Sequence, residues 1–292
     1  MAGTLISAPA LAPHLRDPDW IIVDCRHDLS APQAGREAFQ SGHIPGATFM
    51  HMDEDLSSPA DGRNGRHPLP DPHQLVSRLN AAGIGAHTQV VVYDAHGGMM
   101  AARLWWLLRW IGHDAVAVLD GGLPAWLAAG LALEPGSPTP HQVSTTPLVV
   151  RLRPWVVRCD QVLADLQARA STAASADGFL LVDARAATRF RGENETLDPV
   201  GGHVPGAINR PFADNLADAR FKSATDLRAD WLTVLGGQDA DAVVHMCGSG
   251  VSACHNVLAM ELAGLSGSRL YAGSWSEWCA DPARPVATGE AR

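Results

Sequence analysis

One cysteine of the chain stands where a thiol can do chemistry. Cys247 follows the apolar run 243–246 and precedes a short glycine loop, 248–250, after which a helix-forming stretch begins. In an open parallel sheet, ligands bind beyond the carboxyl ends of the strands, where loop amides and a helix N-terminus concentrate positive potential. A thiol at this position ionises more readily than a free cysteine. The pattern therefore favours a nucleophilic cysteine over the alternative, a buried structural one.

The elements that position this loop follow from the apolar pattern. Short runs rich in Val and Ile predict buried parallel strands at 20–24, 90–94, 115–119, 179–183, 242–246 and 269–271. Helices are expected at 99–111 and 251–263, because each stretch is followed by a glycine that suits a helix C-cap. This order predicts an α/β fold in which helices flank parallel sheets.

The chain is an internal repeat. The run Trp20-Ile-Ile-Val-Asp-Cys-Arg26 matches 179–185, and Gly42-His-Ile-Pro-Gly-Ala47 matches 202–207. We predict an N-terminal domain (1–133), a linker rich in Pro, Ser and Thr (134–150) and a C-terminal domain (151–292). At an offset of 152 positions, Ala95 stands where the second copy has Cys247. The first copy is therefore predicted to be catalytically silent.

Composition excludes several classes of protein. The 292 residues carry a formal net charge of −9, which disfavours nucleic acid and anionic membranes as partners. No apolar run approaches the roughly 20 residues that span a bilayer, and the first residues do not read as a leader, so we expect a cytoplasmic protein. The five cysteines include no CxxC pair, and the histidines lack metal-site spacing. Reduced thiols and no metal are expected.

Taken together, these motifs make the sequence similar to the two-domain rhodanese/3-mercaptopyruvate sulfurtransferase family over nearly its whole length. The resemblance adds Leu119-Asp-Gly-Gly122, Cys247-Gly-Ser-Gly-Val-Ser-Ala253 and Gly273-Ser-Trp-Ser-Glu-Trp278 to the repeated motifs above. It implies two tandem rhodanese-like domains, of which the second carries sulfur as a persulfide on Cys247. It also implies a small-molecule sulfur donor, a thiol acceptor such as a thioredoxin-like protein, or cyanide, and no cofactor.

The family's loop sorts sulfur donors. Members that use thiosulfate carry basic residues after the cysteine, whereas members that use 3-mercaptopyruvate carry Cys-Gly-Ser/Thr-Gly-Val. The present loop is neutral, which favours 3-mercaptopyruvate with release of pyruvate. The resemblance assigns donor binding to Gly248, Gly250, Val251 and Ser252.

The resemblance also implies a relay and a carboxylate site. Ser249, His67 and Asp53 match a Ser/His/Asp relay, in which a histidine manages the donor's protons and the acid orients its ring. Arg189 matches the family's first donor-binding arginine, and Arg191 is the alternative. The planar guanidinium of an arginine suits the carboxylate of a 2-oxo acid. The family's second arginine has no counterpart in 193–200.

Three other functions deserve comparison. A thiosulfate sulfurtransferase keeps the same chemistry with another donor, and a non-catalytic sulfur-relay or binding module keeps only the fold. A Cys-x5-Arg phosphatase is disfavoured because the sixth residue after Cys247 is Ala253.

Overall fold

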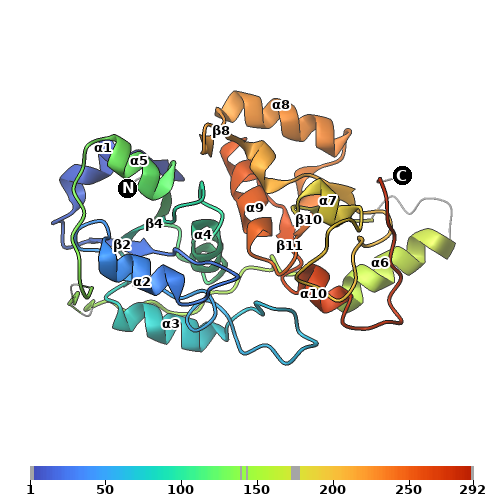
Figure 1. Ribbon diagram of the computed structural model, residues 1–292, viewed down its shortest axis with the longest axis horizontal. Helices are drawn as coiled ribbons and strands as arrows, with labels where there is room; N and C mark the ends of the chain where they lie inside the picture. Colours follow the sequence, from blue (N-terminus) through green and yellow to red (C-terminus); the bar gives the residue numbers. More distant parts are fainter. Residues whose placement is uncertain (1–2, 139, 143, 172–177, 291–292) are drawn as a thin grey trace. The chain divides into compact units, whose positions relative to one another are not determined.

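The computed structural model describes residues 3–138, 140–142, 144–171 and 178–290 (Figure 1). The chain divides into two compact units. Unit 1 comprises Met1–Ser58, Pro70–Arg153 and Asp218–Phe221, and unit 2 comprises Pro59–Leu69, Pro154–Ala217 and Lys222–Arg292. The segment 59–69 of the first repeat thus packs with the unit that holds the second repeat.

Unit 1 is built on a five-stranded parallel sheet in the order β1-β5-β4-β2-β3. Its central strand, β4, is buried along its whole length, as is typical of a parallel sheet that is covered on both faces. The three strands predicted for the first repeat are confirmed, and a short strand is added at each edge. The strands are β1 (Leu5–Ile6), β2 (Trp20–Asp24), β3 (Thr48–Phe49), β4 (Gln89–Tyr93) and β5 (Val116–Leu119).

Helices complete unit 1. The predicted helix after β4 is confirmed as α4, and nine of its ten residues are buried, including its three tryptophans. α3 begins where the Asp71 carboxylate accepts the N–H groups of His73 and Gln74 and proline fills the first turn. The helices are α1 (Ala8–Leu11), α2 (Ala34–Ser41), α3 (Pro72–Ala81), α4 (Ala101–Trp110) and α5 (Gly122–Ala128), with a 3-10 turn at Ala12–His14.

Unit 2 repeats this plan with a four-stranded parallel sheet in the order β11-β10-β6-β7. The strands are β6 (Leu180–Asp183), β7 (Ile208–Asn209), β10 (Val243–Met246) and β11 (Arg269–Leu270), and the short β8 (Leu216–Ala217) lies outside that sheet. β9 (Arg220–Phe221) belongs to unit 1. The helices are α6 (Cys159–Ser171), α7 (Ala187–Phe190), α8 (Ala224–Leu235), α9 (Ser252–Leu262) and α10 (Ser274–Trp278), with 3-10 turns at Phe212–Asn215 and Ala240–Ala242.

The repeated motifs have the same structural role in both units. In unit 1, Arg26 pairs with Asp24 at the end of β2 and donates to the Gly42 carbonyl at 2.7 Å. In unit 2, Arg185 follows β6 and donates to the Gly202 carbonyl at 2.6 Å. Each arginine therefore links an interior strand of its sheet to the Gly-His-x-Pro-Gly-Ala turn of its own unit.

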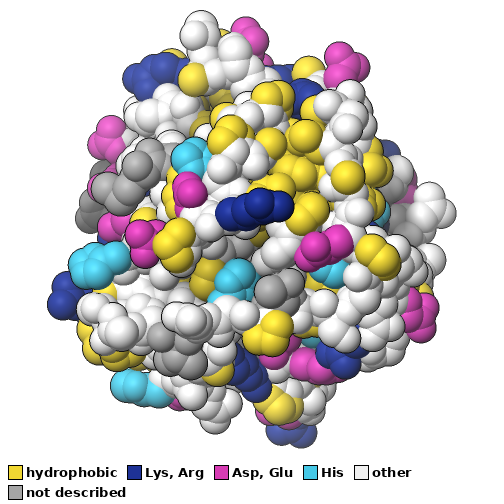
Figure 2. Space-filling model, turned by 90° about the vertical axis from the view of Figure 1, so that its left-hand side faces the viewer, with side chains coloured by type: hydrophobic (Ala, Val, Ile, Leu, Met, Phe, Trp, Pro, Cys, Tyr) yellow, Lys and Arg dark blue, Asp and Glu magenta, His cyan; other side chains and the backbone are white. Residues whose placement is uncertain are grey.

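The distribution of charged side chains on the surface is relevant to nucleic acid and anionic membranes, the partners that the net charge disfavours. On the face shown in Figure 2, basic side chains lie scattered among acidic, histidine and apolar ones rather than in a wide basic patch. Among the helices in the described part of the chain, none is long and apolar enough to cross a membrane.

Candidate active site

Cys247 lies where β10 ends and the turn into α9 begins. β10 is buried throughout, and the Cys247 side chain is only 2% exposed. The Gly250 N–H donates to the Cys247 Sγ at 3.1 Å, and the Cys247 N–H donates to the Ser274 Oγ at 3.0 Å. The loop therefore holds the sulfur with a backbone donor aimed at it, which stabilises an anionic sulfur.

Glycines allow the loop to close in this way. Gly250 has φ +79°, and a Cβ there would lie 2.3 Å from the Ala272 carbonyl oxygen. A side chain is thus excluded both by the backbone conformation and by the neighbouring chain. Val251 next to it is buried, and Ser252 is the first residue of α9.

Ser249 in the same loop meets His67. The Ser249 Oγ and the His67 Nδ1 are 2.6 Å apart, and both side chains are buried. His67 comes from the segment 59–69, which packs with unit 2. A hydroxyl bonded to an imidazole beside a thiol can move a proton to or from a molecule bound there.

The approach of segment 59–69 is fixed by a glycine. Gly65 has φ +88°, and a Cβ there would lie 2.8 Å from the Gly273 carbonyl oxygen. The next residue, Arg66, donates its backbone N–H to the Ser276 Oγ at 3.0 Å. These contacts hold Arg66 and His67 against the turn into α10.

Asp53, the third predicted member of the relay, belongs to unit 1. Its Oδ2 lies 3.9 Å from a ring nitrogen of each of two histidines, His27 and His51. Its role beside His67 stays a prediction.

The same three residues form a possible metal-ligand group. Among the described residues, His27, His51 and Asp53 place their ligand atoms within 4.8 Å of one another. His51, however, already uses both ring nitrogens: Nδ1 accepts the Asp53 N–H at 3.1 Å, and Nε2 bonds to the Pro32 carbonyl at 2.9 Å. Because its tautomer is fixed by these bonds, His51 has no lone pair left for an ion, and the group does not fit a metal.

Arg189, the predicted carboxylate ligand, lies beside the cysteine loop. It forms a bidentate pair with Glu195 at 2.8 and 3.0 Å and bonds to Asp198 at 3.0 Å. Its guanidinium Nη1 is 3.5 Å from the position of a Cβ on Gly248. The alternative, Arg191, pairs instead with the exposed Glu193 at 2.9 Å.

A second guanidinium at this place was not predicted from the sequence. The Arg66 Nη2 is 2.7 Å from the position of a Cβ on Gly248, and Arg66 binds Asp198 through the oxygen that Arg189 leaves free. Asp198 is nearly fully buried; burial raises the pKa of its carboxyl, which Arg66 and Arg189 lower only in part. The one sequence signal for Arg66 is that it directly precedes His67.

A third cation is buried in the same region. The guanidinium of Arg185 stacks over the Trp275 ring at 4.8 Å. Burial lowers the pKa of Arg185, but the negative charges of Asp183, Glu195 and Cys247 raise it by a larger amount. The pKa of Arg185 is therefore raised overall. Arg185 thus keeps its positive charge near the Cys247 sulfur.

The other cysteines are poor nucleophiles. Burial raises the pKa of the Cys25 and Cys159 thiols, and it raises that of Cys279 to about 11. Cys254 donates its S–H to the Gly250 carbonyl at 3.2 Å. All five thiols are free and buried, so reactivity depends on the loop that surrounds Cys247.

In unit 1 the corresponding loop holds a carboxylate instead of a thiol. Ala95 stands at the cysteine position, and Asp94 before it is fully buried. Gly98, the counterpart of Gly250, donates its N–H to Asp94 Oδ1 rather than to a sulfur. In all, four loop amides bind the two Asp94 oxygens, at 2.7 to 3.0 Å: those of His96, Gly98, Met100 and Ala101.

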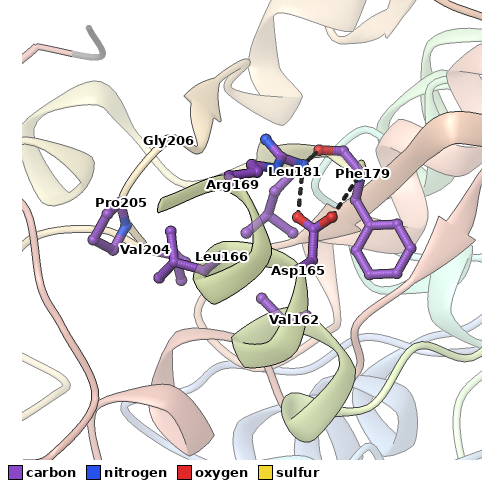
Figure 3. Close-up of a pocket in the computed structure, with 9 residues that line it drawn as sticks. All are labelled: Val162, Asp165, Leu166, Arg169, Phe179, Leu181, Val204, Pro205 and Gly206. Carbon is purple, nitrogen blue, oxygen red and sulfur yellow. Dashed lines mark hydrogen bonds and ion pairs between the residues drawn. The ribbon is translucent and has the colours of Figure 1, made fainter. Parts of the chain in front are cut away.

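A pocket elsewhere in unit 2 offers no comparable chemistry. It lies beside α6, and its lining is largely apolar (Figure 3). Its charged pair is satisfied internally, since Asp165 binds Arg169 at 2.6 Å and accepts the Phe179 N–H at 3.1 Å. This pocket holds no nucleophile and is not the site.

Known proteins are similar to this chain in sequence and in fold. The family model for the rhodanese-like domain matches residues 7–129 and 163–281. A protein of Pseudomonas aeruginosa, provisionally named a 3-mercaptopyruvate sulfurtransferase, is 48% identical, covering 99% of each chain. One of Mycobacterium tuberculosis, provisionally named a thiosulfate sulfurtransferase, is 39% identical, covering 98% of each. The structure of 3-mercaptopyruvate sulfurtransferase from Leishmania major matches with TM-score 0.82 and 30% identity over 97% of this chain and 75% of that one.

The fold is that of the rhodanese-like domain, present twice, and only the second copy has a cysteine in its loop. The chain belongs to the two-domain rhodanese/3-mercaptopyruvate sulfurtransferase family, a family of sulfurtransferase enzymes.

Proposed function

We propose that the protein transfers sulfur from 3-mercaptopyruvate to a thiol or cyanide acceptor through a persulfide on Cys247. The observation that carries this is the Cys247 sulfur, held by the Gly250 N–H beside the Ser249–His67 pair. The catalytic domain is the second (151–292), and the first (1–133) is silent because it holds Ala95 and Asp94 in the corresponding loop. The name of the relative at 48% identity supports the choice of donor.

In the first half-reaction, the Cys247 thiolate attacks the sulfur of 3-mercaptopyruvate. The S–S bond forms as the C–S bond breaks, and the electron pair of that bond passes to the carbon, which leaves as the enolate of pyruvate. The enolate takes up one proton to give pyruvate, and the persulfide loses one. The donor carbon is thereby reduced and the two sulfurs are oxidised, without any further oxidant.

Protons in this step pass through Ser249 and His67. Ser249 directly follows Gly248 in the cysteine loop, and its hydroxyl is hydrogen-bonded to His67. Ser249 and His67 together can therefore relay the persulfide proton to the enolate. Asp53 is proposed to orient His67. Arg189 binds the donor carboxylate, while Gly248, Gly250, Val251 and Ser252 shape the loop against which the donor lies.

In the second half-reaction, an acceptor thiolate attacks the outer sulfur and restores the Cys247 thiolate. A small dithiol, a thioredoxin-like protein or cyanide can serve as this acceptor. Both half-reactions balance with donor, acceptor and these side chains alone, so the proposal needs no metal or organic cofactor. We propose that the protein acts in the cytoplasm. Cell fractionation, with the protein detected by an antibody, tests this.

Mass spectrometry tests the central step. The protein is incubated with 3-mercaptopyruvate, and the peptide that contains Cys247 is examined for one added sulfur. Cys247→Ser is expected to lose both the added sulfur and pyruvate release. Cys254→Ser is the matched control, since it changes a thiol in the same peptide. If wild-type protein gains no sulfur at Cys247, the proposal is wrong.

Thiosulfate is the second candidate donor. It is favoured by the three guanidinium groups near the loop, which suit a dianion, and by the name of the Mycobacterium tuberculosis relative. Comparing kcat/KM for the two donors decides between them, and the neutral loop predicts that 3-mercaptopyruvate is preferred. Full biological function in Cys247→Ser protein would instead support a non-catalytic module.

A further inference from the structure

The donor carboxylate site lacks one of its expected arginines. The stretch 193–200, in which the family's second arginine would stand, contains none. What it contributes instead are two carboxylates, Glu195 and Asp198, and both of them bind Arg189. A cation that completes the site must therefore come from another part of the chain.

Arg66 meets the geometric requirement. The guanidinium groups of Arg66 and Arg189 both approach Gly248, at 2.7 and 3.5 Å from the position of its absent Cβ. Gly248 directly follows Cys247, so the two cations flank the residue next to the nucleophile. Both side chains remain partly exposed, at 28% and 21%, which leaves them open to a ligand.

Asp198 joins the two arginines. One of its oxygens binds Arg66 and the other binds Arg189, so a single carboxylate spans the two forks. This is the bridging geometry that a bound carboxylate would adopt between two guanidinium groups. With Glu195 on Arg189, two positive charges are matched by two negative ones, and the pair is held in place before a donor arrives.

We propose that Arg66 is a specificity-determining residue that binds the donor carboxylate together with Arg189. Asp198 holds both guanidinium groups when the site is empty and competes with the donor for them. The inference rests on the proposed function, since it concerns the donor of that reaction. It also explains why the cysteine loop can remain free of basic residues: the cation is supplied by the segment that carries His67.

A pair of donors isolates the carboxylate. 3-Mercaptopyruvate and mercaptoacetone present the same thiol beside a ketone, but mercaptoacetone has a methyl group in place of the carboxylate. Arg66→Met is expected to raise KM for 3-mercaptopyruvate about ten- to a hundred-fold, the effect of losing one charge-assisted bond. Its kcat/KM for mercaptoacetone should stay within about threefold of wild type, which a merely structural role for Arg66 would not produce.

Arg63→Met is the matched control. Arg63 is exposed, lies in the same segment and carries the same charge, so its variant should retain wild-type KM for both donors. Asp198→Asn provides a change in the opposite direction: with the competing charge removed, KM for 3-mercaptopyruvate should fall several-fold. Thermal melts of all three variants establish that they are folded.

The outcomes separate the two proposals. If Arg66→Met matches Arg63→Met with 3-mercaptopyruvate, or loses both donors equally, the assignment of Arg66 is wrong. If wild-type protein gains no sulfur at Cys247 from 3-mercaptopyruvate, the proposed function itself fails. A fall of activity specific to the carboxylate-bearing donor supports the inference.

Discussion

Replacing Asp94 by alanine tests whether the silent loop is held together by its own carboxylate. Asp94 is fully buried and accepts four backbone N–H groups. Each N–H group left without an acceptor costs about 1–3 kcal/mol of stability. Removing the buried carboxylate and letting water bind the N–H groups offset part of this total cost. We expect Asp94→Ala to lower the free energy of unfolding of unit 1 by about 3–6 kcal/mol.

Hydrogen exchange is the suitable assay because the chain has two units and need not unfold in one step. Amides of β4 and α4 should lose protection in Asp94→Ala, whereas those of β10 and α9 should not. Asp28→Ala is the control: this exposed carboxylate accepts the Ser30 N–H at 2.8 Å, and water can replace it. Its loss should leave the exchange of β4 and α4 unchanged.

Formate provides a second, independent readout. It carries the same carboxylate and fits the space that the side chain leaves, so it should raise the melting temperature of Asp94→Ala well above any effect on wild type or Asp28→Ala. A variant that keeps wild-type protection in β4 and α4 would refute the idea that the carboxylate holds this loop. Protection lost without any response to formate would show that the loop needs Asp94 for another reason.

Three further changes have defined outcomes. Ser249→Ala should lower kcat with 3-mercaptopyruvate about 10²–10⁴-fold in steady-state assays, because the proton path to His67 is cut, with little change in melting temperature. Gly250→Ala should abolish sulfur loading of Cys247 and lower the melting temperature, because φ is +79° and the added Cβ would meet a carbonyl at 2.3 Å. Burial lowers the pKa of His245 to about 3 from 6.5, so its stabilising contribution is full above pH 6.5 and is lost as the pH falls toward 3. His245→Asn should flatten the acid dependence of unfolding by about 1.4 kcal/mol per pH unit in that window, which denaturant titrations at several pH values measure.

Much of the fold could be predicted because apolar periodicity and duplication point to the same elements. The strand predicted at 242–246 is β10 (Val243–Met246), and the helix predicted at 251–263 is α9 (Ser252–Leu262). Both lie in the buried centre of their unit, where burial imposes a strong pattern on the residues. Because Cys247 follows the strand and precedes the helix, its place at the carboxyl end of the sheet could be predicted from the sequence.

Two residues were missed because their roles depend on particular contacts, one between distant parts of the chain and one within a single loop. Arg66 stands in a polar loop of the first repeat, yet its guanidinium lies beside Gly248. Asp94 was not predicted because the repeat aligns Ala95 with Cys247, whereas the carboxylate of Asp94 binds the amides of its own loop. Neither property leaves a periodic trace in the sequence.

The packing of segment 59–69 with unit 2 has a consequence for the history of the duplication. A copy without a catalytic thiol would ordinarily be redundant and free to accumulate mutations or to be deleted. Here the first copy supplies His67 and Arg66, so a gene that kept only the second copy would encode a cysteine loop without either residue. If His67 and Arg66 act as proposed, selection on sulfur transfer also preserves the half that has no nucleophile, and mutations in segment 59–69 have the phenotype of active-site mutations.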